Sequence, residues 1–303
     1  MTNPTTTQPK NISLVLGSGG ARGLAHIGII RWLEEHDYQI QSISGSSIGA
    51  LIGGLYACGK LDEFEHWLKK LSKSDILALF DIAWDRSGLI RGEKLHAVLT
   101  KLIGTPRIEE LRIPYTAVAT DINNEKEVWL QSGDLLQAMR ASYSLPMIFT
   151  PVKYKGLTLI DGGVINPVPI APTFGQGSDL TIAVNLGAKP KPPTFEQNAE
   201  TKDESDWLDF DELIANIKEF FTIEKKALKQ SFDWDVYDIS NKAFDSMQSS
   251  IARQQLAAYP PDITIDIPRN ACGMLEFTQV EKMVKLGYDT AQQTLAEDSV
   301  NPE

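Results

Sequence analysis

Apolar positions near the start of the chain fall into short runs that are interrupted by glycines. Ile12–Leu16 is such a run, and its length is typical of a buried strand. Residues 23–37 then carry apolar side chains at helical spacing, with Leu24, Ile27, Ile30 and Leu33 on one face. Gln39–Ser44 predicts a second strand, and residues 47–57 predict a second, glycine-rich helix. Because strand and helix alternate over such short distances, the pattern predicts βαβ units around a mainly parallel sheet.

Later apolar runs extend this pattern and predict a three-layer α/β/α fold. Further strands are expected at Tyr115–Thr120, Val128–Leu130, Thr158–Ile160, Leu180–Asn185 and Ile263–Ile267. We expect residues 1–10 to form a disordered tail. Residues 11–303 are expected to form a single domain whose C-terminal part is helical.

The composition changes between residues 189 and 212. Prolines open this stretch, and residues 196–212 hold eight acids and one lysine, which predicts a solvated acidic loop or insertion. The amphipathic stretch Leu213–Leu228 follows. It either covers the core, as most such helices do, or forms a mobile lid or a patch that touches lipid.

The overall composition narrows the function classes. The chain has 303 residues, 42% of them hydrophobic, as in an ordinary globular protein. Its net charge of -11 disfavours nucleic-acid partners and limits any membrane contact to a local or transient one. The two cysteines, Cys58 and Cys272, lie far apart, so neither a zinc site nor a redox pair is expected. With no apolar signal segment at the N-terminus, we expect a cytoplasmic location.

Two glycine-containing stretches imitate other classes of protein. No charged residue occurs from Tyr38 to Gly59, but the many glycines and serines there fit a buried strand and helix better than a membrane span. Residues 54–60 have the spacing of a phosphate-binding P-loop, but Leu61 stands where a serine or threonine would be required. Gly59 is therefore predicted to end a helix.

The sharpest motif is Gly45-Ser46-Ser47-Ile48-Gly49, a G-x-S-x-G sequence between a predicted strand and a predicted helix. This is the context of a nucleophile elbow, in which Gly45 and Gly49 leave room for a tight turn that raises Ser47 above the edge of the sheet. The N-terminus of the following helix favours negative charge at that place. The alternative is a tight turn without chemistry.

A second glycine-rich segment, Gly17–Gly23, also joins a strand to a helix. A dinucleotide-binding loop is disfavoured, because Arg22 occupies the third glycine position and no acid ends the next strand. A structural turn and an oxyanion hole remain. In the latter, the amides of Gly19 and Gly20 would bind the negative oxygen of a tetrahedral intermediate. Because adjacent parallel strands end at one edge of a sheet, this loop should lie beside the elbow.

Two kinds of base compete for the activation of Ser47. No histidine follows residue 96, which excludes the order Ser…Asp…His of the α/β-hydrolases; the four are His26, His36, His66 and His96. A triad would need an earlier histidine. The other candidate is Asp161, which ends a predicted strand and precedes two glycines. Its alternative role is an ordinary Asp-Gly hairpin turn. No cluster of residues indicates a metal site.

Three segments in this order, Gly17–Gly23, Gly45–Gly49 and Asp161–Gly163, resemble the patatin-like phospholipases, in particular the bacterial branch related to neuropathy target esterase. Further similar segments are Arg140–Pro146, Asn166–Pro169 and Pro260–Asp262. The resemblance is strong over residues 11–187 and loose elsewhere. One departure is Ser18, where many members have glycine.

The resemblance implies a serine acyl hydrolase of lipid-like esters, of phospholipase A or lysophospholipase type. Ser47 would be the nucleophile and Asp161 its base, in a dyad without histidine, while Gly19, Gly20 and Arg22 would belong to the oxyanion loop. No cofactor or metal is implied. The expected partners are a lipid or acyl-ester substrate and, transiently, a membrane or micelle, and a homo-oligomer is compatible with the family.

Two rival functions stay open on the sequence. The first is a non-catalytic regulatory or binding protein that keeps the fold but has a dead site. The second is an acyltransferase that passes the acyl group to an acceptor other than water.

Overall fold

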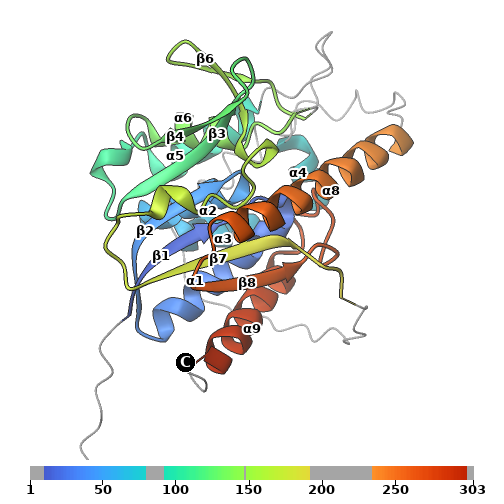
Figure 1. Ribbon diagram of the computed structural model, residues 1–303. Coiled ribbons are helices and arrows are strands. Elements are labelled where there is room, and N and C mark those ends of the chain that lie inside the picture. The colour runs from blue at the N-terminus through green and yellow to red at the C-terminus, as the bar shows by residue number, and fades with distance from the viewer. Residues whose placement is uncertain (1–9, 80–91, 147, 192–233, 299–303) are drawn as a thin grey trace, which may run out of the picture.

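A single mixed sheet forms the centre of the molecule (Figure 1). The computed structural model describes residues 10–79, 92–146, 148–191 and 234–298. Within these ranges the sheet contains eight strands, namely β1 (Lys10–Leu16), β2 (Tyr38–Ser46), β3 (Tyr115–Asp121), β4 (Lys126–Leu130), β5 (Val152–Tyr154), β6 (Leu157–Asp161), β7 (Leu180–Ala188) and β8 (Ile263–Pro268). Their order is β5-β6-β3-β2-β1-β7-β8, and β4 pairs with β3 beside this path.

Helices flank the sheet on both faces, as Figure 1 shows. The α-helices among the described residues are α1 (Ala25–Glu35), α2 (Ile48–Ala57), α3 (Leu61–Lys69), α4 (Lys73–Leu79), α5 (Glu93–Ile103), α6 (Leu135–Ser142), α8 (Trp234–Ala258) and α9 (Val280–Asp298). Short 3-10 helices are η1 (Gly20–Leu24), η2 (Ile108–Glu110), η3 (Gly162–Val164) and η4 (Ala171–Thr173).

The sheet has a parallel half and an antiparallel half that meet at β3. Strands β3, β2, β1, β7 and β8 run parallel to one another, whereas β4 and β6 pair antiparallel with β3, and β5 with β6. The central strands are buried along most of their length because helices cover both of their faces, which explains their nearly continuous apolar sequences.

Alternate side chains of β1 enter two separate cores. Leu14 and Leu16 belong to the larger core, which also contains the apolar faces of α1, α2 and α9. Val15 points to the other face of the sheet and packs in a smaller core with Ala183 of β7 and Ala252 of α8. The molecule is thus a three-layer α/β/α structure with a mainly parallel central sheet, which confirms the predicted fold class.

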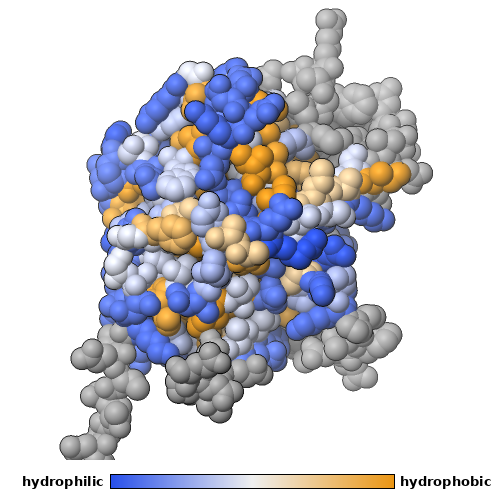
Figure 2. All heavy atoms as spheres, in the orientation of Figure 1, coloured by the Kyte–Doolittle hydropathy of each residue, from blue (hydrophilic) through white to orange (hydrophobic). Residues whose placement is uncertain are grey.

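The long helix α8 crosses in front of β7 in Figure 1. Its inner face carries the small core just described, whereas its outer face leaves apolar side chains open to solvent. Ile239 and Met247 are 68% and 56% exposed. Figure 2 shows hydrophilic side chains over most of this face of the molecule and apolar ones gathered along and beside α8.

The predicted strands are all present, with ends that differ by a few residues. Lys10, predicted as part of the tail, is the first residue of β1, since its backbone pairs with Tyr38 of β2. The charge-free stretch forms β2 and α2, as predicted, and no described helix is both long and apolar enough to cross a membrane. Gly59 ends α2 with a positive φ of 72°, also as predicted.

Other features differ from the prediction or lie outside the described residues. The three-residue strand β5 was not expected, because its Val-Lys-Tyr sequence is too short to indicate a strand, and among the described strands it pairs only with the adjacent β6. The acidic segment 196–212, the stretch Leu213–Leu228 and residues 1–9 of the expected tail are outside the described residues.

Candidate active site

Ser47 occupies the sharp turn between β2 and α2. Its backbone has φ 56° and ψ -123°, a conformation that side-chain-bearing residues rarely adopt, so the turn is strained. Gly49 lies against the end of β1, where a Cβ would overlap the carbonyl oxygen of Leu16. Ser47 is 9% exposed. The turn therefore has the form of a nucleophile elbow.

A second serine holds the backbone of this turn. The amide of Ser47 donates a hydrogen bond of 3.0 Å to Oγ of Ser142, the last residue of α6. The Ser142 hydroxyl in turn donates to the carbonyl oxygen of Val118 on β3, at 2.6 Å. Both serines are buried, so this relay ties the strained turn to the neighbouring strand.

The Ser47 hydroxyl meets the carboxyl group of Asp161. It donates a hydrogen bond to Oδ2 at 2.5 Å, across 114 residues of sequence. Asp161 is the last residue of β6 and is fully buried. The other carboxyl oxygen, Oδ1, accepts the amide of Gly163 at 2.7 Å, which fixes the orientation of the carboxyl group.

Burial changes the acidity of Asp161. Loss of contact with water raises the pKa of its carboxyl group to about 7, although the hydrogen bonds from Ser47 and Gly163 act in the opposite direction. A carboxyl group with such a pKa is a much better proton acceptor than an ordinary aspartate, and near neutral pH it exists in both protonation states. The site therefore contains a hydroxyl group bonded to a carboxylate of raised basicity.

The turn that follows Asp161 is not a hairpin. Asp161 precedes η3, and the next strand along the chain, β7, pairs with β1 and β8 instead of β6. Among the described residues, none of the hydrogen bonds of Ser47 or Asp161 involves a histidine. The hairpin alternative is therefore wrong, and the geometry offers no histidine partner for Ser47.

The glycine-rich loop after β1 keeps two amides free. Its other amides are used: Gly17, Ser18 and Ala21 donate to the carbonyl oxygens of Val184, Pro167 and Met274. Within the described part of the chain, the amides of Gly19 and Gly20 have no protein acceptor. These are the two donors that an oxyanion hole in this loop would use.

Arg22 does not point into the site but holds the loop from behind. Its Nε donates to the carbonyl oxygen of Gly19 at 2.9 Å, and one terminal nitrogen donates to the carbonyl oxygen of Arg269 at 2.9 Å. The other terminal nitrogen pairs with Asp245 of α8 at 2.6 Å. Because C=O and N–H of one peptide point in opposite directions, the bond to the Gly19 oxygen turns the Gly20 amide away from Arg22.

His26 holds the same loop two peptide groups earlier. It is fully buried, and burial lowers the pKa of its ring to about 4, so the ring is neutral at pH 7. Its Nε2 lies 2.9 Å from the carbonyl oxygen of Gly17, to which it must donate. His26 thus supports the loop and does not contact the serine.

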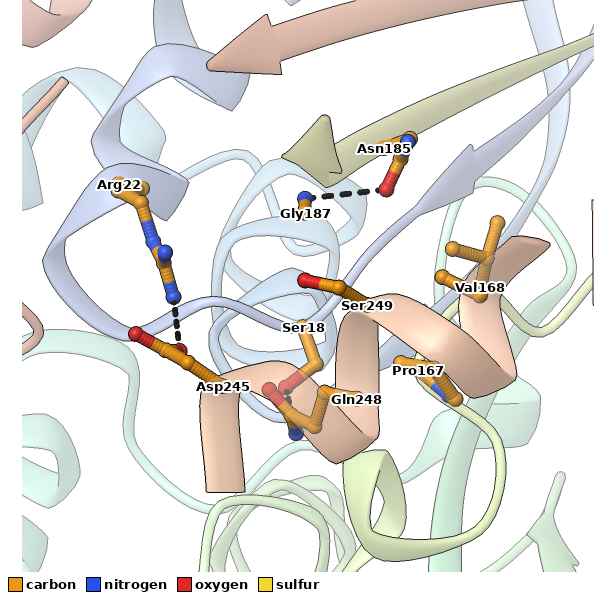
Figure 3. Close-up of a pocket in the computed structure, with 10 residues that line it drawn as sticks. Ser18, Arg22, Pro167, Val168, Asn185, Gly187, Asp245, Gln248 and Ser249 are labelled. Carbon is orange, nitrogen blue, oxygen red and sulfur yellow. Dashed lines mark hydrogen bonds and ion pairs between the residues drawn. The ribbon is translucent and has the colours of Figure 1, made fainter. Parts of the chain in front are cut away.

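The three glycine segments are in direct contact. A Cβ on Gly49 of the elbow would approach the carbonyl oxygen of Gly17, and a Cβ on Gly163 would overlap the side chain of Ser18. Gln248 of α8 also donates to the Ser18 hydroxyl at 3.0 Å, as Figure 3 shows. The loop therefore contacts both the elbow and the Asp161 turn.

Three residues of this arrangement were missed by the motif analysis. Ser142 lies inside Arg140–Pro146, which was noted only for its resemblance to the family, so a local signal existed. Asp245 and Gln248 lie in a helix without any motif. Among the described residues, no group of three or more His, Cys, Asp or Glu side chains could hold a metal ion.

Comparison with known proteins gives a consistent picture. A family model described as patatin-like phospholipase matches residues 14–174. An uncharacterized NTE family protein of Mycobacterium bovis is 35% identical over 94% of this chain and 91% of its own length. The lysophospholipase NTE1 of Scheffersomyces stipitis is 33% identical over 58% of this chain, a match that spans 12% of that protein. The crystal structure of VipD from Legionella pneumophila aligns with a TM-score of 0.46 at 16% identity, over 96% of this chain and 67% of that one.

Proposed function

This chain belongs to the patatin-like phospholipase family, and from that premise we propose that it is a serine acyl hydrolase that cleaves lipid esters with a Ser47–Asp161 dyad. The observation that carries the proposal is the buried hydrogen bond of 2.5 Å between the Ser47 hydroxyl and the Asp161 carboxylate. The amides of Gly19 and Gly20, which have no acceptor among the described residues, support the proposal, since their loop contacts the elbow.

In the first half of the reaction the acyl group moves to the enzyme. Oγ of Ser47 attacks the ester carbonyl carbon while Asp161 accepts the hydroxyl proton. The carbonyl oxygen becomes an anion, which the Gly19 and Gly20 amides and the N-terminus of α2 stabilise. The intermediate then expels the alcohol, which takes the proton from Asp161, and the acyl group stays on Ser47 as an ester.

In the second half water replaces the alcohol. Asp161, again ionised, accepts a proton from water as the water oxygen attacks the acyl carbon. The same amides stabilise the second tetrahedral anion. Its collapse releases the fatty acid, and the proton returns from Asp161 to Ser47, so the enzyme is restored and one water is consumed.

We propose that the substrates are lipids with a single acyl chain, such as lysophospholipids. The support is the name lysophospholipase carried by the fungal relatives, which match 58% of this chain at 33% identity. A panel of short esters, lysophospholipids and diacyl phospholipids, compared by kcat/KM, tests the substrate class. A preference for diacyl phospholipids would contradict it.

The test of the dyad uses two adjacent serines. Ser47→Ala should abolish both the hydrolysis of p-nitrophenyl esters and labelling by a fluorophosphonate probe. Ser46→Ala is the matched control, because Ser46 is fully buried and its hydroxyl has no partner among the described residues. It should hydrolyse and label like the wild type.

The outcomes of this test separate the rival functions. A wild-type protein that does not label at Ser47 would have a dead site. Labelling without release of free fatty acid, but with acyl transfer to an added alcohol, would indicate an acyltransferase. Retention of hydrolysis in Ser47→Ala would refute the assigned nucleophile.

We extend the proposal to the domain organisation and the location. Residues 11–303 are proposed to form one domain with an acidic insertion near 189–212, and the continuous sheet from β1 to β8 supports this. The free thiols of Cys58 and Cys272 support a reducing compartment such as the cytoplasm.

A further inference from the structure

Helix α8 contacts the glycine-rich loop with two polar side chains one turn apart. Asp245 pairs with Arg22, and Gln248 donates to the hydroxyl of Ser18. Figure 3 shows both side chains extending from the same side of α8 toward the loop, at the edge of a small polar hollow. The family model matches residues 14–174, so α8 lies outside the matched segment.

The peptide between Gly19 and Gly20 needs an external support. Glycine has the largest conformational freedom of all residues, and Gly20 adopts a φ of 59°, so two adjacent glycines allow this peptide to rotate at little cost. Gly19 packs against Leu186 but has no side chain of its own to fix its carbonyl group. The bond from Arg22 Nε to the Gly19 oxygen supplies the missing constraint.

Arg22 can hold this oxygen only if its own planar group is held. The Arg22 side chain is 3% exposed, and its guanidinium nitrogens each have one partner: the Gly19 oxygen, the Arg269 oxygen and Asp245. Among these partners only Asp245 carries a charge. A buried arginine without a counter-charge is unfavourable, and its position would relax toward water. The Asp245 carboxylate therefore compensates the charge of Arg22 and holds the plane of its guanidinium group.

We propose that Asp245 is a positioning residue for the oxyanion hole, acting through Arg22 to keep the Gly19–Gly20 peptide turned so that its amide faces the oxyanion. The inference rests on the proposed function, because an oxyanion forms only if Ser47 attacks an ester. It assigns to α8 a part in the chemistry that goes beyond covering the sheet.

The experiment compares Asp245→Ala, Asp245→Asn and Ser246→Ala. Ser246 is the matched control, since it is exposed and, within the described part of the chain, its hydroxyl bonds only to the carbonyl oxygen of Lys242 in the same helix. Asp245→Ala should lower kcat on a soluble p-nitrophenyl ester by about ten- to a hundredfold, which does not exceed the fall in kcat typical of removing one oxyanion-hole donor. KM should stay within about twofold of the wild-type value. Asp245→Asn, which keeps an oxygen acceptor for Arg22, should fall between Asp245→Ala and wild type.

A second readout isolates the oxyanion. Ser47 Oγ adds to the carbonyl carbon of an aliphatic trifluoromethyl ketone. The ketone oxygen then becomes an anion at the position that the oxyanion of the tetrahedral intermediate would occupy. Its inhibition constant should rise by the same factor by which kcat falls. A fall in kcat with unchanged inhibition, or wild-type kcat in Asp245→Ala, would overturn the proposal. Thermal unfolding of each variant shows whether Asp245→Ala is folded. If Asp245→Ala is unfolded, the kcat and the inhibition constant of the milder variant Asp245→Asn decide the proposal.

The contact between helix and loop can also be tested without activity. Amide hydrogen exchange of the peptide covering residues 17–24 should be faster in Asp245→Ala than in Ser246→Ala. Equal exchange in the two variants would refute the support of the loop by Asp245. If the wild-type protein neither hydrolyses esters nor reacts with the ketone, the proposed function fails, and the exchange measurement alone decides whether α8 orders the loop.

Discussion

Two strand-to-helix turns lie side by side at one edge of the sheet and expose different kinds of group. The elbow after β2 presents a side chain, Ser47, on a strained backbone. The loop after β1 presents bare backbone amides at Gly19 and Gly20. The elbow is held from within the core, by Ser142 and the strand beneath it. The backbone of the loop is held by two long polar side chains, Arg22 at the end of the loop itself and His26 in α1.

The difference follows from what each turn must expose. A turn that presents one hydroxyl can be locked by close backbone packing, since only that side chain has to be free. A turn that presents amides must keep its own side chains small, so it loses the means to fix itself. Long polar side chains, from the end of the loop and from neighbouring elements, then take over this task. The elbow should therefore be sensitive to packing, whereas the loop should be sensitive to ion pairs.

The largest effect is expected where Ser47 of the elbow meets its proposed base, Asp161. Asp161→Asn should lower kcat by about 10⁴-fold, because the amide cannot accept the proton of Ser47 although it has the same shape. Turnover of a soluble ester by the purified variant measures this. Activity within about tenfold of the wild type would show that another group serves as the base.

Stability measurements provide the control for this variant. The folded-state pKa of Asp161, about 7, lies above the unfolded value of about 4, so the folded protein binds more protons between these pH values. The contribution of this group to stability is present at low pH and is lost as the pH rises to about 7. At pH 8 the Asn variant should therefore unfold at a temperature no lower than that of the wild type.

The next effect is on the pH profile of the wild type. Because only ionised Asp161 can act as the base, kcat/KM should rise about tenfold per pH unit up to about pH 7 and then level off. At pH 5 the loss is on the order of a hundredfold. The pH dependence of kcat/KM is measured by separating and quantifying the products. This avoids an absorbance assay, whose signal would change with the ionisation of nitrophenol. A flat profile from pH 5 to 8 would contradict the raised pKa.

A smaller effect is expected in the loop. Arg22→Lys keeps the positive charge but lacks the planar fork that reaches the Gly19 oxygen, the Arg269 oxygen and Asp245 together. We expect kcat to fall about tenfold or somewhat more, with KM nearly unchanged. The fluorophosphonate should still label Ser47, but more slowly. A change confined to KM would contradict the role of the loop in binding the oxyanion.

The smallest effect compares two buried serines of one segment. Ser142→Ala leaves the Ser47 amide without its acceptor, which should cost about 1–3 kcal/mol of stability and lower kcat by about tenfold. Ser144→Ala is the matched control, since its hydroxyl bonds to the side chain and backbone of Arg140 and not to the elbow. It should lose comparable stability without loss of kcat. Equal losses of kcat would mean that Ser142 acts through stability alone.

Much of the fold is encoded locally and could be predicted. The strands that become β1, β2 and β3 are apolar runs with glycine turns, and the elbow lies where its spacing indicates. The antiparallel half was harder, because the pairing of β6 with β3 depends on contacts between distant segments. The β5 strand alternates between partly buried and exposed residues, but with three residues it is too short to be recognised in the sequence.

The candidate site shows the same division between local and distant information. Ser47, Gly19 and Gly20 belong to short motifs, and the sequence suggested Asp161 as a base from its place after a strand. The direction in which Arg22 points could not be read from its motif, since it depends on Asp245, 223 residues away. Ser142 lies in a family-like segment, but its role could not be predicted because its bond to the Ser47 amide joins residues 95 positions apart.

The separation between Arg22 and Asp245 has a consequence for synthesis. A ribosome translates the loop, Ser47 and Asp161 well before it reaches α8, so a nascent chain holds both members of the dyad while the guanidinium still lacks its counter-charge. If the ion pair supports the loop as proposed, full activity requires translation of α8 and of the Arg269 segment that follows it. A polypeptide that ends before α8 would then lack the counter-charge on which the geometry of the Gly19–Gly20 peptide depends.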